Sequence, residues 1–166
     1  MKFKKFFIIF ILVFFSFNAF ANTPRSTGKY KNWESFVAET EKGKICFAQT
    51  VPTKRAPAAV KRNKSKIFVT FRPSEEIKDE VSLTSGHDYK TSSVTASSGK
   101  RKYSFFSQKD FAWLLDDQEE KKFIQLMKKA TDIIVKARTA NGAETTDHYS
   151  MMGFTKAYNT AKKACN

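Results

Sequence analysis

The stretch ICFAQTV, residues 45–51, indicates the fold class, because its side chains alternate as those of a β-strand do. Successive side chains of a strand point to opposite faces of a sheet. One face of this segment carries Ile45, Phe47 and Val51, and the other carries Cys46 with small residues. The sequence therefore predicts a strand at 45–51.

Further short strands are predicted on both sides of this segment. Pro52 ends it, and the β-branched and aromatic run at 67–71 indicates a strand that is buried on both faces. A loose polar segment is expected at 22–28. Apart from 45–51, the predicted strands are residues 30–38, 67–71, 81–84, 92–96 and 102–107.

Two short helices are predicted toward the C-terminus, where apolar residues recur with a helical period. The first covers residues 119–130 and can be capped by Asp116 or Asp117. Its apolar stripe is Phe123, Leu126, Met127 and Ala130. The second helix has a stripe near the end of the chain, made of Phe154, Ala157, Tyr158, Ala161 and Cys165.

A β-hairpin is predicted between these helices, around the Asn-Gly dipeptide at 141–142. Asn-Gly suits a two-residue type I′ turn, whose central positions both need positive φ. The register that follows pairs Lys136 with Asp147 and Ile134 with Tyr149. Many short strands between turn residues usually build a sandwich or a barrel. We therefore expect a mostly β fold, a β-sandwich or barrel-like single domain, with two short helices, one at the C-terminus.

The first 21 residues have the pattern of a cleaved signal peptide. Three lysines precede an apolar run at 6–15, and Ala19-Phe20-Ala21 supplies the small-x-small cleavage pattern. The alternative is an uncleaved anchor, but the run has about 10 residues where a bilayer needs roughly 20. Cleavage would leave a single domain, residues 22–166, without an integral membrane span. Such a protein would be periplasmic, or secreted or surface-associated.

Export gives the two cysteines a specific meaning. Cys46 and Cys165 form the only possible intramolecular pair, and the compartment permits disulfides. Cys165 falls on the inward stripe of the last helix, so we predict that it bonds to Cys46. Two free thiols are the alternative, and a nucleophilic cysteine is a weaker one.

Positive charge dominates the composition. The chain carries 30 basic and 16 acidic residues, a net charge of +14. Without the three lysines of the leader, 27 basic residues remain against 16 acidic ones, a net charge of +11. This charge excludes an acidic calcium-buffering protein. It favours anionic partners such as phospholipid head groups or acidic cell-wall polymers, with nucleic acid ranked last because an exported protein seldom meets it.

Two basic runs are the candidate binding site. Residues 42–72 contain no acidic side chain, and a second run precedes the strand at 102–107. The alternative is that these charges are merely solvated. The predicted anion-binding patch consists of Lys54, Arg55, Lys61, Arg62, Lys64, Lys66, Lys100, Arg101 and Lys102.

The sequence contains no recognisable catalytic or metal-binding motif. His87 and His148 each lie next to an aspartate, but adjacent strand residues point to opposite faces and do not form a relay. The spacings of a metal-binding histidine pair, a serine hydrolase and a Cys-x-x-Cys site do not occur. We therefore predict no catalytic residue, no metal ligand and no cofactor.

Four short motifs extend over nearly the whole mature chain. They are Tyr30-Lys31-Asn32-Trp33, Cys46-Phe47-Ala48-Gln49, Phe111-Ala112-Trp113-Leu114-Leu115 and Gly153-Phe154-Thr155-Lys156-Ala157. In these motifs the chain resembles the invasion-associated locus B family of exported bacterial proteins. Members of that family often have a further cysteine soon after the tryptophan, where this chain has Val37.

The resemblance implies a periplasmic or surface-associated β domain without established catalytic residues, linked in some pathogens to host-cell entry. We therefore expect a non-catalytic, virulence-associated envelope protein that acts by binding. Its basic patch would contact anionic envelope or host surfaces, or an envelope or host protein. The alternative is an envelope hydrolase or modifying enzyme with an unrecognised active site. A deep pocket that joins His87 or His148 to a carboxylate would favour this enzyme.

Overall fold

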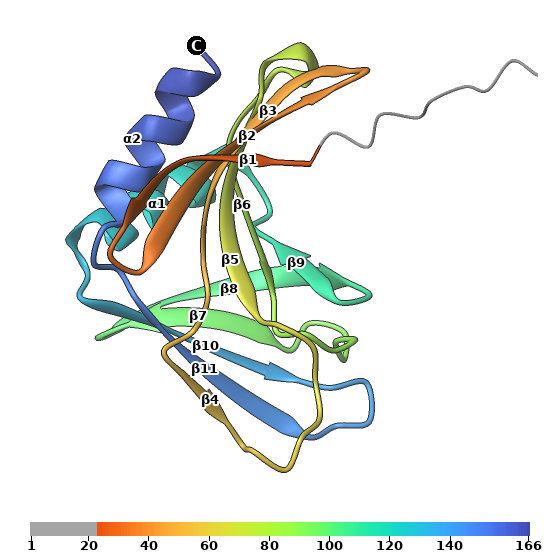
Figure 1. Ribbon diagram of the computed structural model, residues 1–166. Helices are drawn as coiled ribbons and strands as arrows, with labels where there is room; N and C mark the ends of the chain where they lie inside the picture. The colour runs from red at the N-terminus through yellow and green to blue at the C-terminus, as the bar shows by residue number, and fades with distance from the viewer. Residues whose placement is uncertain (1–22) are drawn as a thin grey trace, which may run out of the picture.

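A computed structural model describes residues 23–166 (Figure 1). The expected signal peptide, residues 1–21, and Asn22, the expected start of the mature chain, lie outside the described residues. Within residues 23–166, no helix has the length and the apolar character needed to cross a membrane.

The described chain is built mainly from strands. They are β1 (Arg25–Tyr30), β2 (Trp33–Thr40), β3 (Gly43–Thr50), β4 (Lys54–Ala56), β5 (Lys66–Arg72), β6 (Ile77–Thr84), β7 (Val94–Ser98), β8 (Arg101–Gln108), β9 (Phe111–Trp113), β10 (Asp132–Arg138) and β11 (Glu144–Ser150). The helices are α1 (Asp117–Lys129) and α2 (Phe154–Ala164), and a 3₁₀ turn, η1, spans Pro73–Glu75. This architecture confirms the prediction of a mostly β fold with two helices, one at the C-terminus.

All strands pair antiparallel in one open sheet, in the order β1-β2-β3-β5-β6-β9-β8-β7-β10-β11-β4. Strand β8 changes partner along its length, because residues 101–105 pair with β7 and residues 106–108 pair with β9. In Figure 1 the strands β7, β10, β11 and β4 lie below β1, β2 and β3. We term β1, β2, β3, β5, β6 and β9 the first half-sheet, and β7, β10, β11 and β4 the second half-sheet.

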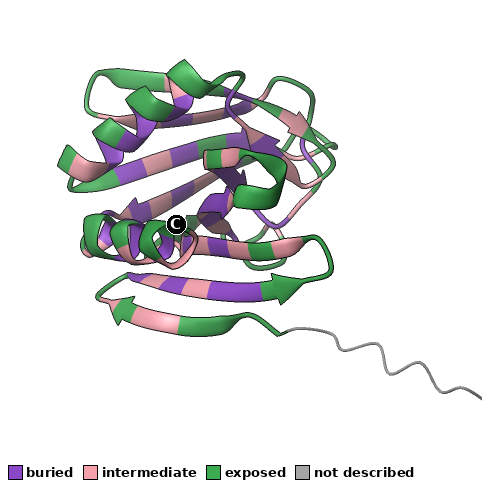
Figure 2. Cartoon of the chain, turned by 90° about the horizontal axis from the view of Figure 1, so that it is seen from above, coloured by how far each residue is buried: buried purple, intermediate pink, exposed green. Residues whose placement is uncertain are grey.

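One hydrophobic core contains side chains from both half-sheets and both helices. Helix α2 packs on β1, β2 and β3, and α1 packs on β6. Figure 2 shows the buried residues of both helices on one side, with exposed residues on the other. The side of the first half-sheet that faces α2 is termed its inner face, and the opposite side its outer face.

Helix α2 is fixed at its first turn. Phe154 packs on Trp33 with ring centroids 4.7 Å apart, and both side chains are fully buried. The indole Nε1 of Trp33 donates to the carbonyl oxygen of Ser150 at 3.0 Å. Gly153 has φ of 96°, and a Cβ there would lie 1.8 Å from the carbonyl oxygen of Tyr30. Only glycine therefore allows the two chain segments to approach this closely.

The predicted disulfide between Cys46 and Cys165 is confirmed. Cys46 lies on the inner face of β3, and Cys165 ends α2, with 5.8 Å between their Cα atoms. The bond closes a loop with a sequence separation of 119 residues. It holds the last turn of α2 against the strand on which the helix packs.

The hairpin register differs from the prediction by one residue. The pairing is Ile133 with Tyr149 and Val135 with Asp147, so Lys136 does not face Asp147. The reason is a three-residue loop at 140–142, which is closed by a hydrogen bond from Thr139 N to Ala143 O at 2.9 Å. Asp147 is the cross-strand partner of the buried Val135, so its side chain points into the protein.

The N-terminal strand predictions are also corrected. The chain reverses direction after Tyr30, with Lys31 at φ of 53°, so the predicted strand 30–38 is the turn between β1 and β2 followed by most of β2. Residues 25–28, expected as a loose segment, belong to β1. An edge strand has one neighbour and needs few apolar side chains, which explains why its polar sequence gave no strand pattern.

We predict that Cys165→Ser lowers the free energy of unfolding, because the variant releases a 119-residue constraint on the unfolded chain. Chain entropy sets an upper limit of about 4–5 kcal/mol. Chemical unfolding of the oxidised wild type, the reduced wild type and the variant measures the loss. The reduced wild type should match the variant. Equal stability of all three would contradict a structural role for the bond.

Candidate functional site

The predicted basic patch is distributed over several parts of the surface. Lys102 on β8 and Lys54 on β4 are the two ends of one cross-strand row. The row runs through the pairs Lys102–Ser97, Ser97–Ile134, Ile134–His148 and His148–Lys54. Arg55 is exposed on β4, and Lys61 and Lys64 are exposed on the loop that follows it. Lys100 and Arg101 are exposed at the turn between β7 and β8.

Arg62 is not part of an exposed patch, and its inclusion is corrected. Its side chain is only 2% exposed and that of Asp147 only 1%. Its Nη1 donates to Asp147 Oδ2 at 2.8 Å. Asp147 Oδ1 receives no well-aligned hydrogen bond, so its 2.7 Å contact with Nη2 is an ionic one. The sequence reasoning missed this pair because the predicted register gave Asp147 a different partner, Lys136, which lies opposite Thr146 in the structure.

The two histidines do not form a catalytic pair with a carboxylate. His87 contacts the Thr145 hydroxyl through Nε2 and the Asp88 carbonyl oxygen through Nδ1, both at 3.0 Å. His148 lies on the exposed row described above, whereas its neighbour Asp147 points inward. Opposite placement of adjacent strand residues agrees with the sequence prediction.

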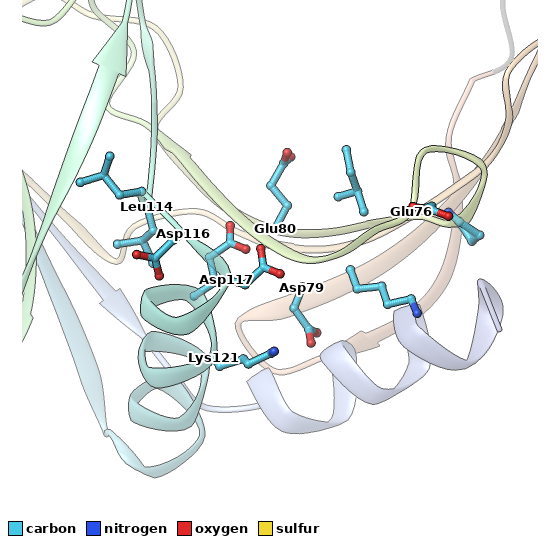
Figure 3. A pocket seen from close by; sticks show the side chains of 12 residues that line it. Glu76, Asp79, Glu80, Leu114, Asp116, Asp117 and Lys121 are labelled. Carbon is cyan, nitrogen blue, oxygen red and sulfur yellow. The ribbon is translucent and has the colours of Figure 1, made fainter.

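An acidic cleft of about 970 Å³ lies between η1, β6 and the start of α1. Its acidic side chains are Glu76, Asp79, Glu80, Asp116, Asp117 and Glu120, against two lysines. Figure 3 shows Asp79, Glu80, Asp116 and Asp117 grouped near the first turn of α1. This concentration of negative charge contrasts with the basic character of the whole chain and can attract cations.

Glu120 is the unusual titrating group of the acidic cleft. Burial raises the pKa of its carboxyl to about 7, and the neighbouring carboxylates of Glu80, Asp117 and Asp79 add to the shift. A hydrogen bond from Val81 N to Glu120 Oε1 at 2.9 Å acts in the opposite direction. The described residues that line the cleft include no histidine, cysteine or serine.

Nor do the described residues provide a metal centre. Among residues 23–166, no group of three or more His, Cys, Asp or Glu side chains has a geometry suited to a metal ion. The carboxylates of the cleft are held instead by protein contacts. The hydroxyl of Tyr158, on α2, donates to Asp79 Oδ1 at 2.6 Å. Mainly because it is buried, the Tyr158 hydroxyl has a pKa well above its ordinary value. The hydroxyl therefore keeps its proton and remains a donor.

A row of six aromatic rings crosses the outer face of the first half-sheet and continues onto β8. We term Phe36, Phe47, Phe68, Phe111, Trp113 and Phe106 the aromatic strip. Neighbouring ring centroids, in this order, are 5.1, 6.1, 6.3, 5.9 and 5.6 Å apart. These separations lie within the range of attractive aromatic pairs. Phe106 is 46% exposed, and the other five are partly exposed.

The strand period places these rings on the outside. In β3, Cys46 and Ala48 point to the core, so Phe47 points away from it. In β8, Phe105 is buried and Phe106 is exposed. The sequence reasoning grouped Phe47 with Ile45 and Val51 and did not identify that face as the outer one. Alternation alone was the available signal, and it does not say which face is covered.

A shallow groove of about 370 Å³ follows the middle of the aromatic strip. Its apolar part is formed by Ile45 and by four rings of the strip, Phe47, Phe68, Phe111 and Trp113. Strand β6 supplies Ser82, which is the cross-strand partner of both Phe68 and Trp113 and leaves a gap between their larger side chains. Arg72 and Glu80 border one side of the groove and bind each other through two hydrogen bonds of 2.8 and 3.2 Å.

Comparison with protein-family models, with curated proteins and with solved structures gives no match for this chain.

We predict that Arg62→Gln lowers the free energy of unfolding by about 3–5 kcal/mol, because it leaves the buried charge of Asp147 with only the 3.9 Å contact to Arg55 Nε. Lys61→Gln is the matched control on the same loop, with an expected change within about 0.5 kcal/mol. The double variant Arg62→Met/Asp147→Leu should recover much of the loss. Urea unfolding measures all three. A loss for Arg62→Gln no larger than for Lys61→Gln would contradict the buried pair.

A second prediction concerns pH. The folded-state pKa of Glu120, about 7, exceeds its ordinary value of 4.5, so the folded protein binds the proton more tightly than the unfolded chain. Stability should therefore fall as pH rises from about 4.5 to about 7. Glu120→Gln keeps the acceptor for Val81 N and should be more stable than wild type at pH 8 but equal to it near pH 4. Glu76→Gln, an exposed neighbour, is the control. A parallel pH dependence of wild type and Glu120→Gln would contradict the assignment.

Proposed function

We propose that the protein is a non-catalytic, exported protein of the cell envelope that acts by binding, and that the aromatic strip is its binding face. The observation that carries this proposal is the continuous row of six neighbouring aromatic rings on the outer face of the sheet. Exposed apolar rows of this size, bordered by polar side chains, are typical of interaction sites. Aromatic residues are also the side chains most enriched in the centres of interfaces.

Three further observations support the envelope assignment. The first 21 residues have the pattern of a signal peptide. The disulfide between Cys46 and Cys165 suits an oxidising compartment. The four sequence motifs resemble those of the invasion-associated locus B family, which is exported. We therefore place the protein in the periplasm or at the cell surface.

The exposed basic residues contribute to the same function at longer range. Lys102 and Phe106 are four residues apart on β8 and therefore point to the same side of that strand. The exposed row that contains Lys54 and Lys102 thus continues the face on which the aromatic strip lies. Lysines attract an anionic envelope surface over about 8 Å at physiological salt, and the rings act only on contact. In this arrangement the charges concentrate the protein near the surface and the strip makes the specific contact.

The two contributions differ in their dependence on salt, and this difference tests the proposal. The purified protein is incubated with isolated cell envelopes at increasing sodium chloride, and the retained fraction is measured after sedimentation. Binding through the strip should persist at high salt, whereas binding through counterion release falls steeply. Phe106→Ala/Trp113→Ala should lose the salt-resistant fraction. Lys54→Gln/Lys61→Gln/Lys64→Gln/Lys102→Gln should lose only the fraction bound at low salt.

Two controls complete this experiment. Met152→Ala removes an exposed apolar side chain that does not belong to the strip and should bind as wild type does. Thermal unfolding confirms that each variant is folded. If retention disappears at high salt for wild type, or if the strip variant keeps a salt-resistant fraction, the strip is not the binding face.

A further inference from the structure

We infer that the aromatic strip binds a linear, neutral polysaccharide, a chain of β-1,4-linked pyranose units, across the first half-sheet. This inference rests on the proposed function and deepens it by naming the class of ligand. A pyranose ring has an apolar face of C–H groups and a rim of hydroxyl groups. It therefore stacks on an aromatic ring while its rim forms hydrogen bonds with neighbouring polar side chains.

The shape of the strip fits a chain ligand. The rings follow one another in single file from Phe36 on β2 to Phe106 on β8. The row runs across the strands, so each ring comes from a different strand except for Phe111 and Trp113 on β9. Polar residues lie on both sides of it. The centre of a protein–protein interface is usually a broad apolar patch. A narrow line of rings is better suited to a flat, extended ligand.

The charges along the strip exclude a ligand that is recognised through phosphate. Lys29, Lys66 and Arg72 are the basic side chains of the first half-sheet on this face, and Glu34 and Glu80 are the acidic ones. Arg72 is paired with Glu80. The Nζ of Lys66 donates to Gln49 Oε1 at 3.1 Å. The first half-sheet's part of this face is therefore close to neutral, because Lys29 lies opposite Glu34 and Arg72 is paired with Glu80. Around the rings themselves it offers little charge to neutralise the phosphates of nucleic acid or an anionic lipid, and Lys54 and Lys102 lie beyond the end of the strip.

The polar groups beside the rings suit sugar hydroxyls. Gln49 and Ser82 are the two cross-strand neighbours of Phe68, and Thr70 borders the same groove. Ser82 and Thr70 both line the groove, and each is mostly buried, at 7% and 8% exposed, so they form its floor between the larger rings. Hydroxyl and amide groups between aromatic rings provide both donors and acceptors, as a rim of sugar hydroxyls requires.

The two tryptophans of the chain provide a direct assay. Trp113 lies on the strip, whereas Trp33 is fully buried under α2. Titration with the soluble β-1,4-linked hexamers of N-acetylglucosamine and of glucose should therefore change the emission of Trp113 alone. Trp113→Phe should lose the signal but still co-sediment with insoluble chitin or cellulose, because a ring remains at that position. An α-1,6-linked dextran should not bind.

One substitution separates ring stacking from general apolar contact. Phe68→Leu keeps a large apolar side chain at the centre of the groove but removes the aromatic face. We expect it to weaken glycan binding about tenfold, as the loss of one stacking contact does. Phe106→Ala/Trp113→Ala should abolish binding measured by co-sedimentation. Met152→Ala is the control for an exposed apolar residue elsewhere.

The outcomes distinguish this inference from the proposed function. The glycan proposal is supported if a hexamer binds, if this binding persists at high salt, and if the folded Phe68→Leu variant binds it more weakly. If neither hexamer nor either insoluble glycan binds while salt-resistant envelope retention still depends on the strip, the glycan is wrong and the binding face stands. Equal binding by Phe68→Leu, or self-association through the strip without glycan binding, also overturns the glycan. If the wild type shows neither glycan binding nor salt-resistant retention by envelopes, both proposals are wrong.

Discussion

The packing of α2 on β2 and β3 is the constraint on which the rest of the structure depends. Phe154 fills the space beside Trp33, Gly153 lets the helix start against the β1–β2 turn, and Cys165 bonds the other end of the helix to Cys46. The helix is thus fixed at both ends on one face of the first half-sheet. This choice makes that face the core and leaves the opposite face, with its aromatic side chains, to solvent.

Much of the fold could be predicted from local sequence patterns. The disulfide could be predicted from the expected export of the protein and from its two cysteines. Strands β3 and β5, both helices and the Cys46–Cys165 bond all have signals within a few residues or in the composition. The three-residue strands β4 and β9 are too short to show a period. The change of partner along β8 also has no signal in the nearby sequence. It depends on β7 and β9, the strands that pair with the two ends of β8.

In the hairpin around 140–142, one additional loop residue changes the cross-strand partner of Asp147. A two-residue turn would have paired Asp147 with Lys136, whereas the three-residue loop pairs it with the buried Val135. A buried carboxylate without a partner is very costly, so a cation must accompany it. Arg62 is that cation, and its recruitment draws the loop after β4 against the sheet. A basic residue that looked like part of a surface patch is therefore part of the core.

The strip and the lysines occupy one continuous face because β8 belongs to both parts of the bent sheet. Its second part carries Phe106 beside Trp113, and its first part carries Lys102 on the same side. The sequence shows both kinds of residue but not their relation, since alternation leaves open which face of each strand is covered. The tertiary structure determines which face is covered, because one face of both half-sheets packs in a common core. Charge then acts at a distance and aromatic stacking at contact, so a single surface combines attraction to the envelope with selection among the molecules found there.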